Sequence, residues 1–372
     1  MNNAFLKSTR EAPLPPPVST SGVVGWLRMN LFSSIGNSLV SGALLLFLVW
    51  LIPQLIDWAF VRAIWSGESG AVCRVDGAGA CWAFVNAKFD QFIYGRYPEA
   101  EHWRVNVIFL LLAGGLMPLA LPTFRYKNHV VLFMLTVFPF AAFVMLLGGT
   151  LGMPQVETNK WGGLLVTLVV AITGIVASLP LGVLLALGRR SDLPVLRIFS
   201  VLFIEFWRGI PLITVLFMAS VMLPLFLPDG VTVDKLLRAL IGVALFSSAY
   251  MAEVIRGGLQ AVPQGQYEAA RALGLSYWQT IFQVVMPQAL RIVIPGIVNT
   301  FIGLFKDTTL VMIVGLFDLL GVVQSNFTDP NWASPQTAMS GYVFVALIFW
   351  VFCFSMSRYS VSVEKRVSFN QR

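Results

Sequence analysis

Charged side chains are scarce in this chain of 372 residues, and that scarcity excludes a soluble globular fold. Asp, Glu, Lys and Arg make up 12% of the residues, against roughly 25% in an average soluble protein. Apolar residues make up 57%, and the mean hydropathy is +0.78. A soluble fold would leave much of this apolar surface in water. We therefore expect an integral membrane protein built only from α-helices.

Histidine is rare as well, and common catalytic motifs are absent. His102 and His129 are far apart and lack the spacing of a metal site. No GxxxxGK[ST] phosphate-binding loop occurs, so we expect no ATP hydrolysis by this chain. No serine lies in a nucleophile-elbow pattern, and basic residues do not cluster with aromatic ones. We expect a protein that is not an enzyme, holds no metal or cofactor, and binds no nucleic acid.

Eight stretches are apolar over about the 20 residues that a membrane-crossing helix requires. Their predicted ranges are 29–56, 105–124, 130–156, 161–188, 200–227, 236–253, 292–316 and 330–357. The segment 57–104 is too polar to cross and is predicted to be a long loop. The ends, 1–28 and 359–372, are predicted to be polar tails, with Pro13–Pro17 extended.

Lys and Arg are distributed unevenly between the two sides that eight spans define. With the N-terminus placed inside, sixteen of them lie on the inner side and eight on the outer side, while Lys306 falls in a span. Loops rich in Lys and Arg stay in the cytoplasm. We therefore expect both termini and the segment 256–290 to be cytoplasmic, with 57–104 outside.

Two of the three cysteines fall in the predicted outer loop. Cys73 and Cys81 have seven residues between them, whereas Cys353 falls in the last predicted span. If the outer side is oxidising, we expect Cys73 and Cys81 to form a local disulfide. Two free thiols are the alternative.

Glu205 and Arg208 fall inside the predicted span 200–227, where charged side chains are costly. They are three residues apart in the sequence FIEFWRGIPL, so they share a helix face and are expected to pair with each other. Gly209 and Pro211 follow and predict a local irregularity in the helix.

A second polar group falls in the predicted span 292–316. Lys306 and Asp307 are neighbours deep in this range, Thr308 follows them, and Asn299 lies one to two turns earlier. Intramembrane polar residues of this kind line a translocation pathway or bond helices of a multi-subunit bundle together. The pattern supports both interpretations.

The segment Val262–Gln288 has the pattern of two short helices joined by a glycine turn. Pro263 suits the start of a helix, and Gly274 suits the left-handed residue that ends one. Ser276 and Gln279 then form the pattern of a capping box.

The second short helix is expected to end near Val285. The residue before a proline is disfavoured in helical geometry, and Pro287 follows closely. The alternative to a functional element is an ordinary loop between two spans.

This segment resembles the coupling loop of inner-membrane permease subunits of bacterial ATP-binding-cassette (ABC) importers. That loop has the form EAA, three residues, G, nine residues, I, one residue, LP. The matching positions here are Glu268, Ala269, Ala270, Gly274 and Pro287, with Val284 in place of Ile and Met286 in place of Leu. FIEFWRGIPL, AYMAEVIRGGLQAVPQGQ and LFKDTTL are similar to the polar amino acid branch. The longer N-terminal part resembles the extended permeases of broad-specificity importers, the type of the general L-amino acid permease M subunit.

The resemblance covers the chain from Trp161 onward and implies a type I importer permease core of five helices at 157–358. The three helices within 29–156, with the periplasmic loop 57–104, would be an extension, and 256–290 would be the cytoplasmic coupling loop. Asn299, Lys306, Asp307 and Thr308 would be candidates for the translocation pathway.

The resemblance also implies partners in the bacterial inner membrane. They are a separate ATPase subunit that binds ATP, a second permease subunit in a heterodimer, and a periplasmic binding protein that delivers amino acids, with lipid around the helices. Transport would follow alternating access. The alternative class is an ion-coupled secondary amino acid transporter or a channel, which needs no capped helix pair.

Overall fold

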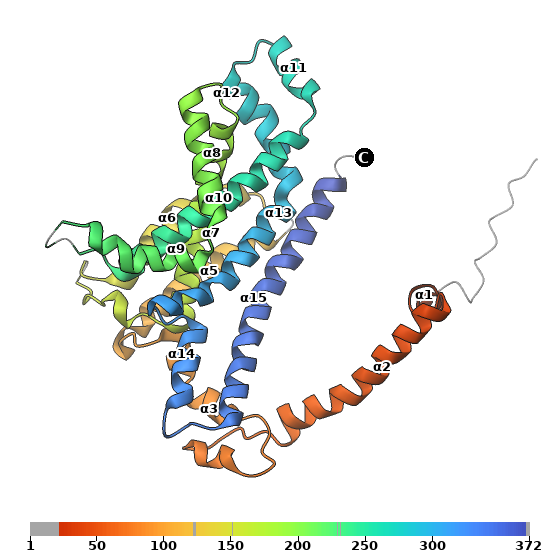
Figure 1. Cartoon of the computed structure of the whole chain (residues 1–372), viewed down its shortest axis with the longest axis vertical. Coiled ribbons are helices and arrows are strands. Elements are labelled where there is room, and N and C mark those ends of the chain that lie inside the picture. The colour runs from red at the N-terminus through yellow and green to blue at the C-terminus, as the bar shows by residue number, and fades with distance from the viewer. Residues whose placement is uncertain (1–21, 122–123, 151, 229, 231, 370–372) are drawn as a thin grey trace, which may run out of the picture. The chain divides into compact units, whose positions relative to one another are not determined.

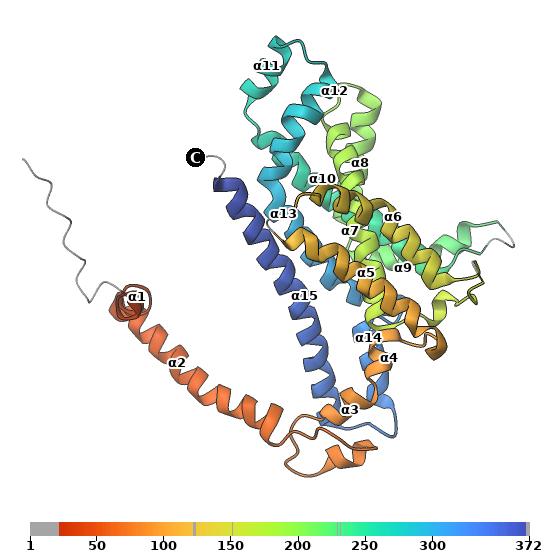
Figure 2. The same cartoon turned by 180° about the vertical axis from the view of Figure 1, so that it is seen from behind.

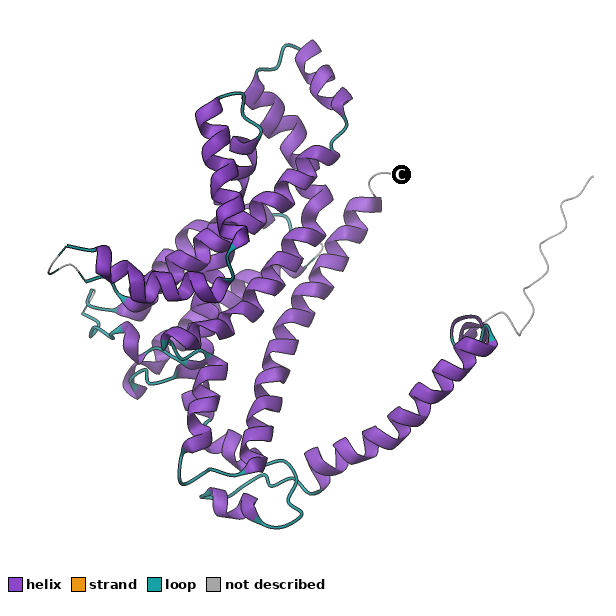
Figure 3. Cartoon of the chain, in the orientation of Figure 1, coloured by secondary structure: helices purple, strands orange, loops and turns teal. Residues whose placement is uncertain are grey.

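A computed structural model of the chain describes residues 22–121, 124–150, 152–228, 230 and 232–369 (Figure 1). Within these ranges the regular structure is helical, and no strand is found there (Figure 3). The predicted all-α fold is therefore confirmed. Most of the predicted N-terminal tail, with Pro13–Pro17, lies outside the described ranges, as do the last three residues.

Seven helical segments among the described residues are long and apolar enough to cross a membrane, and a bent helix pair makes an eighth. The seven are Ile35–Val61, Glu99–Leu119, Lys127–Leu147, Gly163–Arg189, Lys235–Ala261, Tyr277–Val314 and Pro335–Lys365. The bent pair is Pro194–Gly209 with Leu212–Phe226. Each coincides with one predicted span, so the prediction of about eight membrane helices is confirmed.

The chain divides into two compact units, and the first comprises residues 1–64 and 76–80. Its described helices are α1 (Gly22–Asn30) and α2 (Ile35–Ile56). Helix α1 begins inside the predicted tail 1–28. The apolar sequence GVVGWL thus forms helical turns just before the first predicted span.

The second unit comprises residues 65–75 and 81–372. Its helices are α3 (Trp82–Ala87), α4 (Phe89–Tyr94), α5 (His102–Ala120), α6 (Lys127–Leu147), α7 (Gly163–Arg189), α8 (Pro194–Gly209), α9 (Leu212–Phe217), α10 (Lys235–Ala261), α11 (Gln264–Ala272), α12 (Tyr277–Gln279), α13 (Met286–Asp307), α14 (Leu319–Ser325) and α15 (Pro335–Phe369). Helices α7 and α10 pack along each other, and α13 lies between α10 and α15 (Figures 1 and 2).

Glycines allow the central helices to approach closely. A Cβ at Gly182 of α7 would lie 2.7 Å from Met251 Cγ of α10. A Cβ at Gly258 of α10 would lie 2.7 Å from Ala289 O of α13. Helix association in a membrane depends on such packing rather than on a hydrophobic driving force. The three helices α7, α10 and α13 therefore form the rigid centre of the unit.

The segment predicted as one span over 200–227 consists of two helices that meet at an angle of 102°. Helix α8 begins at Pro194, whose fixed backbone angle suits the first helical position, and ends at Gly209. Pro211 is extended, with φ −61° and ψ 141°, and α9 begins after it. The predicted irregularity is therefore a complete break in the helix.

Two helices continue past the ends that hydropathy predicts. Helix α10 runs to Ala261 rather than ending near 253. Helix α15 runs to Phe369, so the predicted tail 359–372 is helical over nearly all of its length. Apolar composition marks where a helix leaves lipid, whereas the helix itself ends where its backbone hydrogen bonds end.

A disulfide joins Cys73 and Cys81, whose Cα atoms are 5.7 Å apart. The segment around it contacts the connection between α14 and α15. Arg74 Nε and Nη2 donate to Ala333 O and Pro330 O at 3.1 and 3.0 Å, and Cys81 N donates to Ser340 Oγ at 2.6 Å. We call residues 65–75 and 81–97 the disulfide cap.

An ion pair adds to this contact. Lys88 Nζ of the cap lies 2.8 Å from Asp329 Oδ2. The hydrogen bond from Lys88 lowers the pKa of Asp329, so this carboxylate stays ionised at neutral pH. The cap thus fixes the end of the molecule where α14 and α15 are connected.

Candidate functional site

Helix α11 ends in a left-handed glycine, as the sequence predicts. Gly274 has φ +76°, and Leu275 N donates to Ala270 O at 3.1 Å. A Cβ at Gly274 would meet no atom within 4 Å. The positive φ, and not a lack of space, is therefore the reason that glycine is favoured at this position. The turn sets the angle between α11 and the helix that follows.

A capping box starts that next helix, also as predicted. Ser276 N donates to Gln279 Oε1 at 2.9 Å, and Gln279 N donates to Ser276 Oγ at 3.4 Å. The backbone N–H of each residue thus donates to the side-chain oxygen of the other, so two backbone donors at the start of α12 are satisfied.

The second short helix does not end near Val285, so this prediction was wrong. The chain passes from α12 through a π-helical turn (Thr280–Val285) directly into α13. Met286, which precedes Pro287, keeps helical angles of φ −60° and ψ −43°. Pro287 lies in the first turn of α13, where a missing N–H is tolerated, and the wide π-helical turn accommodates its ring. The loop is therefore an extension of a membrane helix.

Hydrogen bonds hold α11 against the ends of α7 and α10 (Figure 1). Arg190 Nη1 donates to Leu259 O at 2.9 Å and to Tyr267 Oη at 3.1 Å. Its guanidinium also lies over the Tyr267 ring, 5.6 Å from the centroid. Gln288 Nε2 donates to Gln266 Oε1 at 3.1 Å, which connects α11 to α13. These contacts leave α11 little freedom to move independently.

The segment 256–290 has a buried inner side and an exposed outer side. Ala270 is 3% exposed and packs inward, while Glu268, Ala269, Gly274 and Pro287 are exposed. Large apolar side chains of the same segment are exposed as well: Leu273, Tyr277, Trp278 and Phe282. The Trp278 and Phe282 rings stack with centroids 5.6 Å apart. An exposed apolar surface of this kind marks an interaction site.

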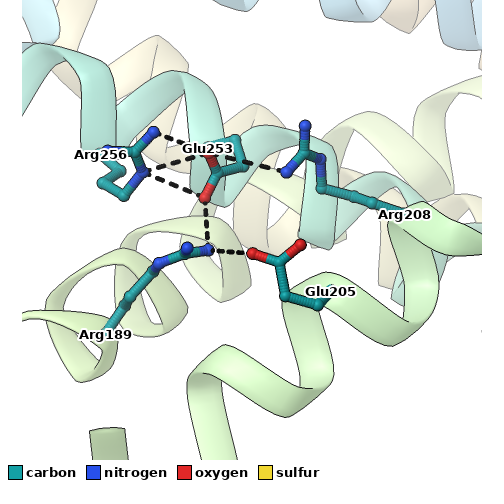
Figure 4. Close-up of polar contacts among 5 residues, drawn as sticks. All are labelled: Arg189, Glu205, Arg208, Glu253 and Arg256. Carbon is teal, nitrogen blue, oxygen red and sulfur yellow. Dashed lines mark hydrogen bonds and ion pairs between the residues drawn. The ribbon is translucent and has the colours of Figure 1, made fainter.

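A network of ion pairs joins α7, α8 and α10 close to this segment (Figure 4). Glu253 is at its centre and receives Arg189 at 2.8 Å, Arg256 at 2.9 Å and Arg208 at 3.7 Å. Arg189 also bonds to Glu205 at 2.9 Å. With three arginines and two glutamates the network has a net positive charge, and its central carboxylate is only 16% exposed.

The predicted pairing of Glu205 with Arg208 is replaced by pairs across helices. Glu205 binds Arg189 from α7, and Arg208 binds Glu253 from α10. Sequence reasoning missed Arg189 and Glu253 because both were placed at the ends of predicted spans. Arg189 and Glu253 are 64 positions apart, and no local pattern links residues at such a distance. The signal that could have identified Glu253 is its charge within an otherwise apolar helix.

The polar residues predicted near residue 306 lie in the second half of α13 and at its end, within the candidate span Tyr277–Val314. Asp307 is the last residue of α13, and a 3-10 helix (Thr308–Val314) follows. Asn299 and Lys306 are exposed, Asp307 is half-buried, and Thr308 is buried with Oγ1 bonded to Phe305 O at 2.8 Å. Asn299 and Lys306 are seven residues apart and share one exposed face of α13.

Comparison with known proteins assigns the chain to a family. The family described as "Binding-protein-dependent transport system inner membrane component" matches residues 178–369. The chain is 52% identical to the inner membrane amino-acid ABC transporter permease protein YhdY of Escherichia coli, over 95% of both chains. It is 40% identical to the glutamate/glutamine/aspartate/asparagine transport system permease protein BztC of Rhodobacter capsulatus, over the full length of both.

A further relative matches about half of the chain. The probable glutamine ABC transporter permease protein GlnP of Bacillus subtilis is 35% identical over 55% of this chain and 90% of its own length. The chain belongs to the binding-protein-dependent inner-membrane transport components, a family of membrane permeases. It is an extended member, since YhdY and BztC align with 95% and 100% of the chain, whereas GlnP aligns with 55% of it.

Proposed function

We propose that the chain is the permease subunit of an ATP-driven importer of amino acids. Family membership and 52% identity to an amino-acid ABC permease support the class. The names of three relatives support amino acids as the substrates, and glutamate, glutamine, aspartate and asparagine are the first to test.

The segment 256–290 is proposed to be the coupling loop, which docks on the ATPase subunit in the cytoplasm. The observation that carries this proposal is its exposed surface, to which Glu268 and Ala269 contribute together with the large apolar side chains Leu273, Trp278 and Phe282. A loop transmits force only if it is stiff. The capped turn and the direct continuation into α13 supply that stiffness.

Substituting Gly274 tests this proposal. We expect Gly274→Arg to insert into the membrane normally but to lose ATP-driven amino-acid uptake at least tenfold. An L-residue in the left-handed region costs about 1–2 kcal/mol, and the long side chain would protrude into the docking surface. Uptake into proteoliposomes that contain the complete importer measures the effect, and co-purification measures binding of the ATPase subunit.

Gly274→Asn is the matched control, because asparagine adopts the left-handed conformation more readily than other residues with side chains. We expect it to retain most of the uptake. Gly274→Arg with wild-type uptake and normal ATPase association would contradict the proposed docking site. Uptake that persists without ATP, driven by an ion gradient alone, would instead favour a secondary transporter.

The partners follow from the same proposal. A periplasmic binding protein delivers the amino acid, and a second, different permease subunit completes a heterodimer around the translocation pathway. Residues 157–358 are proposed to form the five-helix core, and the three helices within 29–156 are proposed to be an extension of it. Asp307 is proposed to line the pathway with Asn299, Lys306 and Thr308, because Asn299 and Lys306 share an exposed face of α13 and Asp307 and Thr308 follow directly at its end.

A further inference from the structure

We propose that a polar pocket on the inner side of the coupling loop binds a free α-amino acid from the cytoplasm, and that its occupation slows uptake. The inference rests on the proposed function, which places this loop in the cytoplasm. The pocket has a volume of about 440 Å³, within the range of roughly 300–1,000 Å³ that small-molecule sites occupy. Its walls are the end of α7 with the turn that follows, the end of α10, and the segment from α11 through α12 to the π-helical turn.

The buried wall of the pocket contains a polar group without a partner. Thr280 is 5% exposed, and its Oγ1 atom is buried with no hydrogen-bond partner in the described part of the chain. Leu187, Leu259 and Ile281 line the same pocket. A buried hydroxyl that forms no hydrogen bond costs roughly 1–3 kcal/mol. A polar ligand in the pocket would supply the missing bond.

The rim of the pocket carries charges of both signs. Arg190 and Arg271 contribute two guanidinium groups, and Asp192 contributes a carboxylate. The Arg190 guanidinium is already oriented by its bonds to Leu259 O and Tyr267. Guanidinium groups suit a carboxylate, and Asp192 suits an ammonium group. Asp192 would repel a phosphate or another polyanion, so the charges favour a zwitterion with a polar side chain.

The position of the pocket connects binding to transport. One wall belongs to α7 and its turn, and the other belongs to the coupling loop that the ATPase must displace. A ligand that bonds to both walls would hold them together and resist that displacement. Because the imported amino acid accumulates on this side, its binding would slow further uptake.

Proteoliposomes with the complete importer and ATP in the lumen test the inference. Luminal ATP selects importers whose ATPase faces the lumen, so the lumen corresponds to the cytoplasm. The initial uptake of labelled glutamine, glutamate, aspartate and asparagine is measured against the luminal concentration of unlabelled L-glutamine. We expect the wild-type rate to fall at least threefold at saturation, and luminal inorganic phosphate to have no such effect.

Variants of the pocket locate the effect. Each uptake rate is divided by the rate of the same variant without luminal L-glutamine. Thr280→Val and Asp192→Asn should then raise the luminal L-glutamine concentration that halves uptake at least fivefold. Thr280→Ser keeps the hydroxyl, and Asp90→Asn removes an exposed acid outside the pocket, so both should behave as the wild type. Equilibrium dialysis of labelled L-glutamine with the importer in nanodiscs, without binding protein, should show the same order of affinities.

Three results would overturn the inference. They are a wild-type rate that is independent of luminal L-glutamine, an equal response in all variants, and inhibition by phosphate that matches that by L-glutamine. Equal dialysis curves for the wild type, Thr280→Val and Asp192→Asn would overturn it as well. Failure of the proposed function is distinguishable, because uptake would then be absent in every preparation while dialysis still measures the pocket.

Discussion

Asp318 shows how a single buried carboxylate organises this fold at the residue scale. Its side chain is completely buried and caps α14 by accepting from Gly321 N and Leu320 N at 2.9 and 3.2 Å. Leu319 N donates to Thr167 Oγ1 of α7 at 3.0 Å. Burial raises the pKa of Asp318 to about 6. One residue thus satisfies two backbone donors of α14, next to the bond that joins it to α7.

Asp307 allows a prediction at the same scale. Asp307→Asn keeps the side-chain volume at the end of α13 and removes only the charge next to Lys306. We expect uptake to change at least fivefold in KM or in maximal rate, because a charge on the pathway acts on a charged substrate. The melting temperature and the assembly of the importer should stay as in the wild type. Transport assays and size-exclusion chromatography measure the two effects, and unchanged kinetics would remove Asp307 from the pathway.

At the scale of elements, the ion network fixes three helices at one point. Glu253 of α10 connects to α7 through Arg189 and to α8 through Arg208 (Figure 4). In an apolar surrounding, charges are stable only when they are paired and hydrogen-bonded. The network therefore determines where α8 lies against α7 and α10, next to the coupling loop.

Replacing each glutamate of the network by glutamine distinguishes the centre of the network from its edge. Glu253→Gln leaves three arginines without their shared partner and should destabilise the subunit by on the order of 2 kcal/mol. Glu205→Gln affects a carboxylate that is 54% exposed, so its effect should stay below about 1 kcal/mol. Thermal unfolding of the purified complex in detergent compares them. Equal shifts for the two variants would show that Glu253 is not the centre.

The disulfide cap is the second element with a testable role. Cys73→Ser with Cys81→Ser should lower stability by about 2–3 kcal/mol, because the bond closes a short loop in the unfolded chain. Reductant should destabilise the wild type by a similar amount and leave the double variant unchanged. Cys353→Ser, at a cysteine outside the disulfide, is the control. A wild type whose melting temperature is insensitive to reductant would contradict a stabilising role for this bond.

At the scale of the whole molecule, the distribution of Lys and Arg predicts the orientation. Sixteen such residues on one side and eight on the other favour a cytoplasmic coupling loop and cytoplasmic termini. This orientation is required by the proposed function, because the ATPase subunit is cytoplasmic.

Thiol labelling measures that orientation directly. In a Cys353→Ser background without the ATPase subunit, Gly274→Cys should react with a membrane-impermeant maleimide in inverted vesicles and not in cells with a permeabilised outer membrane. Glu68→Cys, in the predicted periplasmic loop, should show the reverse. Reaction of Gly274→Cys from the outer side would exclude docking of a cytoplasmic ATPase on this loop.

Local features could be predicted from neighbouring residues. The left-handed turn at Gly274 and the capping box of Ser276 and Gln279 involve residues at most five positions apart, so their geometry depends on the local sequence alone. The position of the bend at Pro211 was predicted, but its angle of 102° was not. The direct continuation of α12 into α13 was not predicted, because the rule for residues before proline does not include a π-helical turn.

The sequence by itself determined an all-helical membrane fold, about eight membrane helices, and the glycine turn with its capping box in the segment 256–290, because hydropathy and capping depend on composition and short spacing. Only the tertiary structure decided the partners of Glu205, Arg208 and Glu253, the position of Asp307 at a helix end, and the pocket around Thr280. These features join residues that are distant in the chain. Which of them meet depends on how α7, α8, α10 and α13 pack, and no local pattern encodes that packing.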